Sequence, residues 1–212
     1  MVEMMTLSFD EQLEALVDRG VAGDEAEFRA VVEVARLPEP PERSVLAMSR
    51  DLVPVAAAAA RIERRGQPVV LGHLEPQELD GFVPIGAVDL PEAPAYVAID
   101  VDLGSQSRNV RPEEALRTIL EAGRSPLTLD EGIALVLQQP EVIASNWGFS
   151  MAGSRRGDQR VPAFWISEDR PKLGWCWDRN PHTWLGTASC ARRSASAAVS
   201  RSRRAHARTI PA

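Results

Sequence analysis

Apolar residues recur every three or four positions in the first 36 residues of the chain, which is the period of an α-helix. Ser8 and Glu11 form a capping box in front of one apolar face, which ends at Gly20. Asp24 and Glu27 form the same kind of capping motif in front of a second apolar helix face. The short connection between the two segments favours an antiparallel pair of helices. Because neither helix is stable alone, we expect the pair to pack on the main body or on another copy of the chain.

Glycine and proline residues divide the middle of the chain into short segments. The alanine-rich stretch predicts a helix over 51–65. Short extended pieces are expected around 69–71 and 82–83. Residues 96–102 form the clearest predicted strand, because apolar side chains alternate along them.

Two further helices are expected after this strand. Pro112 opens the first of them. Its inward face is made of Leu116, Ile119 and Leu120. Thr128 and Glu131 form a capping box at the start of the second, which ends at Pro140.

The C-terminal third predicts two antiparallel strands, 161–167 and 173–178, joined by a loop at 168–172. Side chains alternate along a strand, so this pairing places three tryptophans on one face: Trp165, Trp175 and Trp177. The opposite face then carries Phe164, Ile166 and Cys176. Both faces carry bulky side chains, so helices or a partner must cover at least one of them.

Strands and helices alternate without a βαβ rhythm, which predicts an α+β fold. We assign residues 1–37 to an N-terminal helical hairpin and 38–190 to an α+β main domain, with central helices, short strands and a C-terminal Trp-rich antiparallel sheet. Residues 191–212 form an arginine-rich tail without acidic residues or a periodic apolar face. We expect this tail to be disordered, and its deletion to leave the melting temperature unchanged.

Composition and charge restrict the class of protein. With 44% hydrophobic residues the chain is globular, and its longest apolar run, 53–60, is too short to span a membrane. Acidic residues precede any basic residue at the N-terminus, unlike a secretory signal, so a cytoplasmic protein is expected. The net charge is −6. Without the six arginines of the tail, 18 basic residues stand against 30 acidic ones, and this acidic body argues against nucleic acid as the main partner.

Cysteine and histidine are too sparse for a metal site or a disulfide framework. Cys176 and Cys190 are the only cysteines, and the three histidines are scattered along the chain. Reduced thiols fit this pattern best. We therefore predict neither a metal site nor a cofactor.

Segment 153–160 combines two glycines with several charged residues. Ser154, Arg155 and Asp158 lie in it, and a tight loop of this kind could hold a carboxylate or phosphate between arginines. An arginine–aspartate pair that only locks the loop explains the same residues, and we favour that interpretation. The glycine spacing is not that of a phosphate-binding loop.

His182 follows the last predicted strand, two residues after Asn180. It could act as the general base of a hydrolase or transferase, with Asp158 or Asp100 to orient it and Arg155 to hold an anion. No nucleophile is tied to it by the sequence, so we favour a structural hydrogen-bonding role.

Asp100 and Asp102 fall on the same face of their predicted strand, and paired carboxylates could bind a metal or transfer protons. Acidic residues at the end of a strand, just before Gly104, are also good turn caps. We favour capping.

All five tryptophans lie between residues 147 and 184. Cross-strand aromatic pairs stabilise a sheet by about 0.2–1 kcal/mol each, so a structural role needs no ligand. The alternative is an aromatic platform for a planar or sugar-like ligand. The candidate ligand-binding residues of this region are Ser154, Arg155, Asp158, Trp165, Trp175, Trp177, Asn180 and His182.

Long motifs of the chain resemble a known family. The stretch GSRRGDQRVPAFWISEDRPKLGWCWDRNPHTWLGTASC is similar to the C-terminal signature of an uncharacterised actinobacterial domain of unknown function. The segments RPEEALRTILEAGRSPLTLDEGIALVLQQPE, AYVAIDVDLG and SFDEQLEALVDRGVAGDEAEFRA resemble it too. The resemblance covers most of residues 7–190. It implies an intracellular bacterial protein, and supplies no activity, cofactor or catalytic residue.

Taken together, the sequence predicts a domain that binds a small molecule or a protein, with its site in residues 153–184. An enzyme that uses His182 and Asp158, and a purely structural or oligomerisation module, are the alternatives. The expected partner is a small molecule or a protein, with a homo-oligomer possible; neither specific nucleic acid nor a membrane is expected as a partner.

Overall fold

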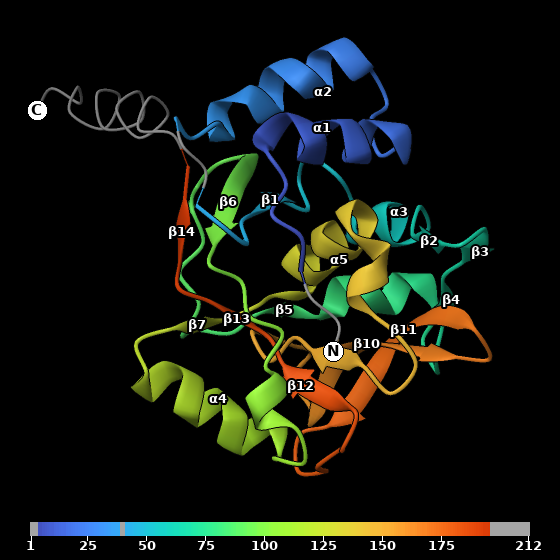
Figure 1. The fold of residues 1–212 in the computed structure, drawn as a ribbon, viewed down its shortest axis with the longest axis vertical. Coiled ribbons are helices and arrows are strands. Elements are labelled where there is room, and N and C mark those ends of the chain that lie inside the picture. Colours follow the sequence, from blue (N-terminus) through green and yellow to red (C-terminus); the bar gives the residue numbers. More distant parts are fainter. Residues whose placement is uncertain (1–3, 39–40, 196–212) are drawn as a thin grey trace, which may run out of the picture.

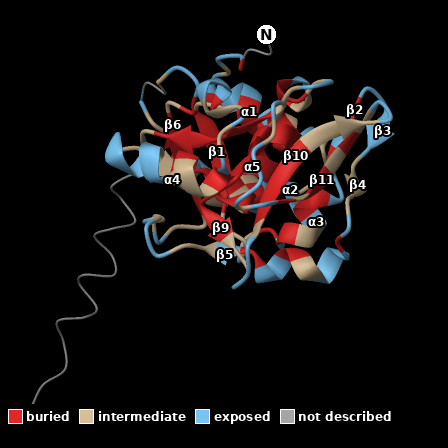
Figure 2. Ribbon diagram, turned by 90° about the horizontal axis from the view of Figure 1, so that it is seen from below, coloured by how far each residue is buried: buried red, intermediate tan, exposed pale blue. Residues whose placement is uncertain are grey.

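A buried helix, α5 (Leu129–Gln138), lies between two β-sheets at the centre of the molecule (Figure 1). The computed structural model describes residues 4–38 and 41–195. Every residue of α5 except Asp130 is buried, and Figure 2 shows this helix surrounded by other buried segments. One side of α5 packs on strand β1. On the other side, a Cβ atom at Gly132 would come 2.0 Å from the Met151 sulfur, so only glycine permits this close approach.

The two sheets differ in strand direction. The smaller is antiparallel and has the order β1-β6-β14, with β1 (Val45–Met48), β6 (Ala95–Ile99) and β14 (Arg192–Ser194). The larger is mixed and has the order β12-β8-β10-β11-β4. Its strands are β4 (Val70–Leu71), β8 (Gly148–Ser150), β10 (Arg160–Ser167), β11 (Arg170–Trp177) and β12 (Leu185–Thr187). The α+β prediction is confirmed.

Shorter elements connect and cover these sheets. Three pairs of two-residue strands are β2 (Glu63–Arg64) with β3 (Gln67–Pro68), β5 (Val83–Pro84) with β9 (Ser154–Arg155), and β7 (Ser125–Pro126) with β13 (Ser189–Cys190). The remaining helices of the main body are α3 (Val55–Ala59) and α4 (Pro112–Glu121). The 3-10 helices are η1 (Glu33–Ala35), η2 (Pro76–Gly81), η3 (Ser105–Ser107) and η4 (Pro140–Val142).

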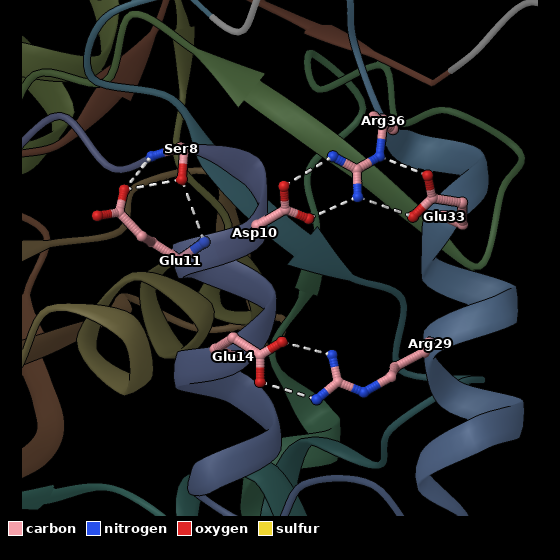
Figure 3. A network of polar contacts seen from close by, with 7 residues as sticks. All are labelled: Ser8, Asp10, Glu11, Glu14, Arg29, Glu33 and Arg36. Atoms are coloured by element: carbon pink, nitrogen blue, oxygen red, sulfur yellow. Dashed lines mark hydrogen bonds and ion pairs between the residues drawn. The ribbon is translucent and has the colours of Figure 1, made fainter.

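The N-terminal helices are α1 (Phe9–Asp18) and α2 (Glu25–Val32), as the capping motifs predict. The Ser8–Glu11 capping box is formed, and two arginines join the helices (Figure 3). Arg29 bonds both carboxylate oxygens of Glu14, at 2.7 and 2.8 Å, and Arg36 bonds Asp10 at 2.6 and 3.2 Å. Helix α1 packs on α5 and β1, so the pair covers the main body.

The helix predicted over 51–65 is present only as α3, and the prediction is wrong for the residues that follow it. Its C-terminal part folds back as the β2–β3 hairpin instead. Arg65 and Gly66 have φ angles of 52° and 75°, which a right-handed helix does not allow. The inward face predicted for α4 is also wrong in part, because Pro112 and Ala115 are its buried residues and Leu120 is 39% exposed.

The predicted register of the tryptophan hairpin is wrong. Only Glu168 and Asp169, both with positive φ, connect β10 to β11. Trp165 therefore pairs with Lys172, and not with Trp175 as a longer loop would require. A shift by an odd number of residues exchanges the faces. Trp165 therefore shares a face with Cys176, whereas Trp175 and Trp177 share the opposite face with Phe164 and Ile166.

The tail begins later than predicted. Strand β14 pairs with β6, and the Arg193 side chain is 4% exposed and bonds the fully buried Glu131 at 2.5 and 2.8 Å. The chain as far as Ala195 thus packs with the main body, so the expectation that disorder begins at 191 is wrong, whereas the effect of a deletion on the melting temperature stays a prediction. The remainder of the predicted tail, 196–212, lies outside the described residues.

The described helices are also short. The longest, α1, α4 and α5, have 10 residues each, about half the length that crosses a bilayer. In the described part of the chain no helix is long and apolar enough to span a membrane.

We predict that Arg193→Ala lowers the free energy of unfolding by about 3–5 kcal/mol, because the Glu131 carboxylate then stays buried without its partner. Urea denaturation measures this loss. Arg193→Lys keeps the charge but not the planar guanidinium, so its free energy of unfolding should lie between those of the wild type and Arg193→Ala. The control is Arg192→Ala at the neighbouring, exposed position, with an effect within about 0.5 kcal/mol. Equal losses at 192 and 193 would contradict the prediction.

Candidate functional site

The loop at 153–160, for which an anion clamp was the less favoured alternative, is bonded to the protein's own groups. Ser154 is fully buried, and its hydroxyl accepts a hydrogen bond from the Leu129 N–H at the start of α5. Arg155 donates to Asp178 at 2.9 Å and to the Ala152 carbonyl at 2.7 Å. Both side chains hold strands β9 and β11 to their neighbours, which is the structural alternative that the sequence favoured.

Asp158 is committed in the same way. It accepts hydrogen bonds from the Arg160 backbone at 2.9 Å and from its guanidinium at 2.8 Å. This contact holds the pKa of the Asp158 carboxyl below its usual range. Arg156 meanwhile bonds Glu78 at 2.7 Å. An ionised carboxylate held by arginine is a poor proton acceptor at neutral pH.

The paired aspartates take different roles. Asp102 accepts a hydrogen bond from the Gly104 N–H at 2.7 Å, which is the turn cap that the sequence favoured. Asp100 has a φ of 54°, so the strand alternation predicted to place both aspartates on one face ends before it. It bonds Arg124 at 2.7 Å and also Arg43, and the Arg124 hydrogen bond, with help from Arg43, lowers the pKa of its carboxyl. Neither aspartate contacts His182 among the interactions of the described residues.

Trp175 and Trp177 form one aromatic patch on the face that carries Phe164. Their ring centroids lie 4.7 Å apart at 70°, in an edge-to-face contact. The Trp175 indole N–H donates to the His73 carbonyl at 3.2 Å, and the Arg160 guanidinium lies 5.5 Å from its ring. Trp177 is 48% exposed, and nearby Asn180 is an exposed residue whose N–H donates to the Trp177 carbonyl.

The other three tryptophans line a surface hollow of about 190 Å³ at the far end of the same sheet. Its residues come from β10, from the turn before β8, and from the residue before β12: Ala144, Ser145, Asn146, Trp147, Trp165, Ile166, Ser167 and Trp184. We call it the tryptophan hollow. None of these side chains is charged.

Glycines allow Trp165 to lie flat across the sheet here. A Cβ atom at Gly174 would come 2.5 Å from the Trp165 ring, and one at Gly72 would come 3.2 Å from it. The Trp165 indole therefore crosses β11 towards β4. The ring also contacts Trp184, with the ring centroids 6.0 Å apart and the planes tilted by 59°.

Arg108 fixes the turn that forms the opposite wall. Its guanidinium lies 3.3 Å from the centroid of the Trp147 ring and donates to the Asn146 carbonyl at 2.9 Å. Asn146 has a φ of 60°, a left-handed conformation that asparagine tolerates better than most residues. The cation–π contact and the hydrogen bond together hold Asn146 and Trp147 at the rim of the hollow.

Polar groups at the tryptophan hollow are left available. Within residues 4–38 and 41–195, the hydroxyls of Ser145 and Ser167 and the Asn146 amide make no side-chain hydrogen bond. The indole N–H groups of Trp147, Trp165 and Trp184 likewise have no hydrogen-bond partner among the described residues, in contrast to that of Trp175, and they are open to water. Donors and acceptors beside apolar rings are the features of a small-molecule site.

His182 packs beside the hollow and does not play the predicted hydrogen-bonding role. Its ring centroid lies 5.1 Å from that of Trp184, at 51°. Its Nε2 atom is buried and has no hydrogen-bond partner among the described residues. Burial lowers the pKa of His182, so the neutral form is favoured. Its backbone carbonyl accepts from the Asn109 N–H, which ties its loop to the turn before α4.

Other parts of the described surface carry less chemistry. A larger, open hollow of about 530 Å³ lies between the end of β1 and the start of β6, and no aromatic or basic residue lines it: Ser49, Asp51, Leu52, Pro91, Glu92, Ala93 and Pro94. Burial raises the pKa of both cysteine thiols to about 12, so neither is an activated nucleophile. Over the described ranges, no three His, Cys, Asp or Glu side chains are grouped to hold a metal ion.

The structure thus brings together only part of the predicted site. Trp165 lines the tryptophan hollow and His182 packs against its wall, whereas Arg155 and Asp158 are engaged elsewhere. Sequence reasoning missed the other residues of the hollow: Ser145, Asn146, Trp147, Ser167 and Trp184. The signal for them was weak, because a Ser-Asn-Trp-Gly turn predicts a bend but not its neighbours.

We predict that His182 makes the fold less stable in mild acid. Its pKa in the folded state lies below the usual value of about 6.5, so the unfolded chain binds the proton more readily and stability falls as pH decreases through that value. Unfolding free energies at about pH 7.5 and pH 5.5 measure the loss, and His182→Gln should reduce it. The same loss in both proteins would contradict the prediction.

Comparison with curated proteins and with solved structures gave no match. A family comparison did: residues 11–196 match DUF5701, a family of unknown function. The matched span includes all strands of both sheets and every residue that lines the tryptophan hollow. The resemblance to a domain of unknown function is thereby confirmed, and the chain belongs to the DUF5701 family.

Proposed function

We propose that this protein is a small-molecule-binding domain and that the tryptophan hollow is its site. The observation that carries the proposal is the unused hydrogen-bonding capacity around the rings of Trp147, Trp165 and Trp184. A tryptophan that only fills a core directs its N–H to a protein acceptor, as Trp175 does. Indoles that line a hollow and have N–H groups without a protein partner are suited to a ligand.

The contacts of the charged residues support binding over catalysis. A hydrolase or transferase of the expected type requires His182 beside an orienting aspartate. Asp158 and Asp100 are paired with arginines instead, and Arg155 is held by Asp178 and by backbone carbonyls. The two thiols are protonated at neutral pH.

A protein-binding role for the opposite face is the second candidate. Trp177 is 48% exposed, and it is among the few large apolar side chains left open in the described chain. Exposed aromatic residues often mark interaction surfaces. The edge-to-face contact with Trp175 also gives Trp177 a structural role, so the case for a binding site is weaker at this patch than at the tryptophan hollow.

A cytoplasmic location in an actinobacterium belongs to the same proposal. Two buried, unpaired cysteines are consistent with a reducing compartment. Protein partners, including a second copy of the chain, and the absence of a nucleic-acid partner stay expectations from the sequence and its acidic body.

The test is a metabolite screen by thermal shift, followed by titration of each hit. We expect Trp184→Ala to weaken binding by about tenfold or more, since it removes one ring wall of the hollow. Trp177→Ala is the matched control on the opposite face and should leave affinity unchanged. Circular dichroism checks that both variants fold, and Ser145→Ala gives a milder second probe. Hits that depend on Trp177 and not on Trp184 would favour the second candidate instead.

A further inference from the structure

The tilt between Trp165 and Trp184 selects the shape of a ligand. Their planes meet at 59° with centroids 6.0 Å apart. A flat base or flavin sandwiched between two rings needs planes that are nearly parallel. A puckered ring differs, because its C–H groups point out of the mean plane and can meet two tilted faces at once. The negative π-faces attract such weakly positive C–H groups.

The hydrogen-bonding groups of the tryptophan hollow select a polyhydroxylated ligand. The indole N–H groups are donors only, the two serine hydroxyls donate and accept, and the Asn146 amide does both. These groups surround apolar ring faces without a charged side chain among them. A ligand that matches them has alternating hydroxyl groups at its edge and C–H groups on its faces, which describes a pyranose.

Beside the hollow lies the only lysine of the sequence. Lys172 pairs directly with Trp165 across the β10–β11 hairpin, so both side chains project from the same face with Cβ atoms about 5 Å apart. Lys172 is half-buried and has no ion pair or side-chain hydrogen bond with the described residues. Its four-carbon stem allows the ammonium to move over the rim of the hollow.

Two further basic residues pair with or contact residues that line the hollow. Arg170 pairs with Ser167, and its Nε atom is buried with no partner in the described chain, while Arg108 lies on Trp147. Two acids, Glu168 and Asp169, lie in the adjoining turn and are exposed to solvent. These three basic residues (Lys172, Arg170 and Arg108) against two acidic ones leave one net positive charge near the hollow, which favours an anion over a quaternary ammonium ligand.

We propose that the tryptophan hollow binds an acidic saccharide, with the pyranose ring against Trp165 and Trp184 and its carboxylate on Lys172. This inference rests on the proposed function and adds the class of ligand to it. The charge-assisted hydrogen bond from the ammonium to the carboxylate gives the acidic sugar its advantage over the neutral parent.

The experiment uses pairs of sugars that differ only in the carboxylate. Methyl β-glucuronide is compared with methyl β-glucoside, and the galacturonide with the galactoside, by quenching of tryptophan fluorescence in the full chain. We expect at least one glycuronide to bind about tenfold more tightly than its neutral partner. Lys172→Gln should remove this preference, Lys172→Arg should keep most of it, and added salt should weaken it.

Two further probes separate this inference from the proposed function. Choline and adenosine stand for a quaternary ammonium and a planar ligand. Equal binding of acidic and neutral sugars overturns the inference, and so does a preference that survives in Lys172→Gln. If choline, adenosine or a hit of the metabolite screen binds in a Trp184-dependent way and no sugar does, the inference fails and the proposed function stands. If no probe or hit depends on Trp184, both fail.

Discussion

The buried ion pair between Glu131 and Arg193 joins the central helix to the last described strand, and much of the fold depends on it. Two charges with side-chain exposures of 0% and 4% have lost their water, so each must be fully bonded by the protein. Glu131 accepts from Arg193 and from the Thr128 N–H, and Arg193 also reaches Ser125 and the Pro126 carbonyl. These contacts fix α5, β7 and β14 relative to one another.

The same constraint extends to the candidate site. Strands β12, β13 and β14 follow one another within residues 185–194, so the anchor at Arg193 limits where β12 can lie. Strand β12 pairs in parallel with β8, and Trp184 immediately precedes it while Trp147 immediately precedes β8. The two tryptophans therefore enter the sheet side by side. Trp165 completes the hollow from β10, the next strand of the sheet.

What could be predicted from the sequence was local. The caps at Ser8, Asp24 and Thr128 involve residues three positions apart, and all three helices begin as predicted. The hairpin register could not be predicted in this way. Glu168 and Asp169 form a tight turn without the glycine or asparagine that normally indicates one. Strand β14 was missed for another reason. Its Arg193 is held by an ion pair with Glu131, which lies 62 positions away in the sequence.

The tryptophans show why a cluster in sequence is not yet a site. Five of them fall within 38 residues, yet the structure divides them between two faces of one hairpin and its neighbours. Ring contacts occur in both groups, so packing alone does not distinguish them. The hydrogen bonds do: Trp175 donates its N–H to a backbone carbonyl, whereas the side chains of the tryptophans of the hollow, and those of Ser145, Asn146 and Ser167, have no hydrogen-bond partner in the described protein. The proposal that a ligand binds at the tryptophan hollow, and not at the patch of Trp175 and Trp177, rests on this difference.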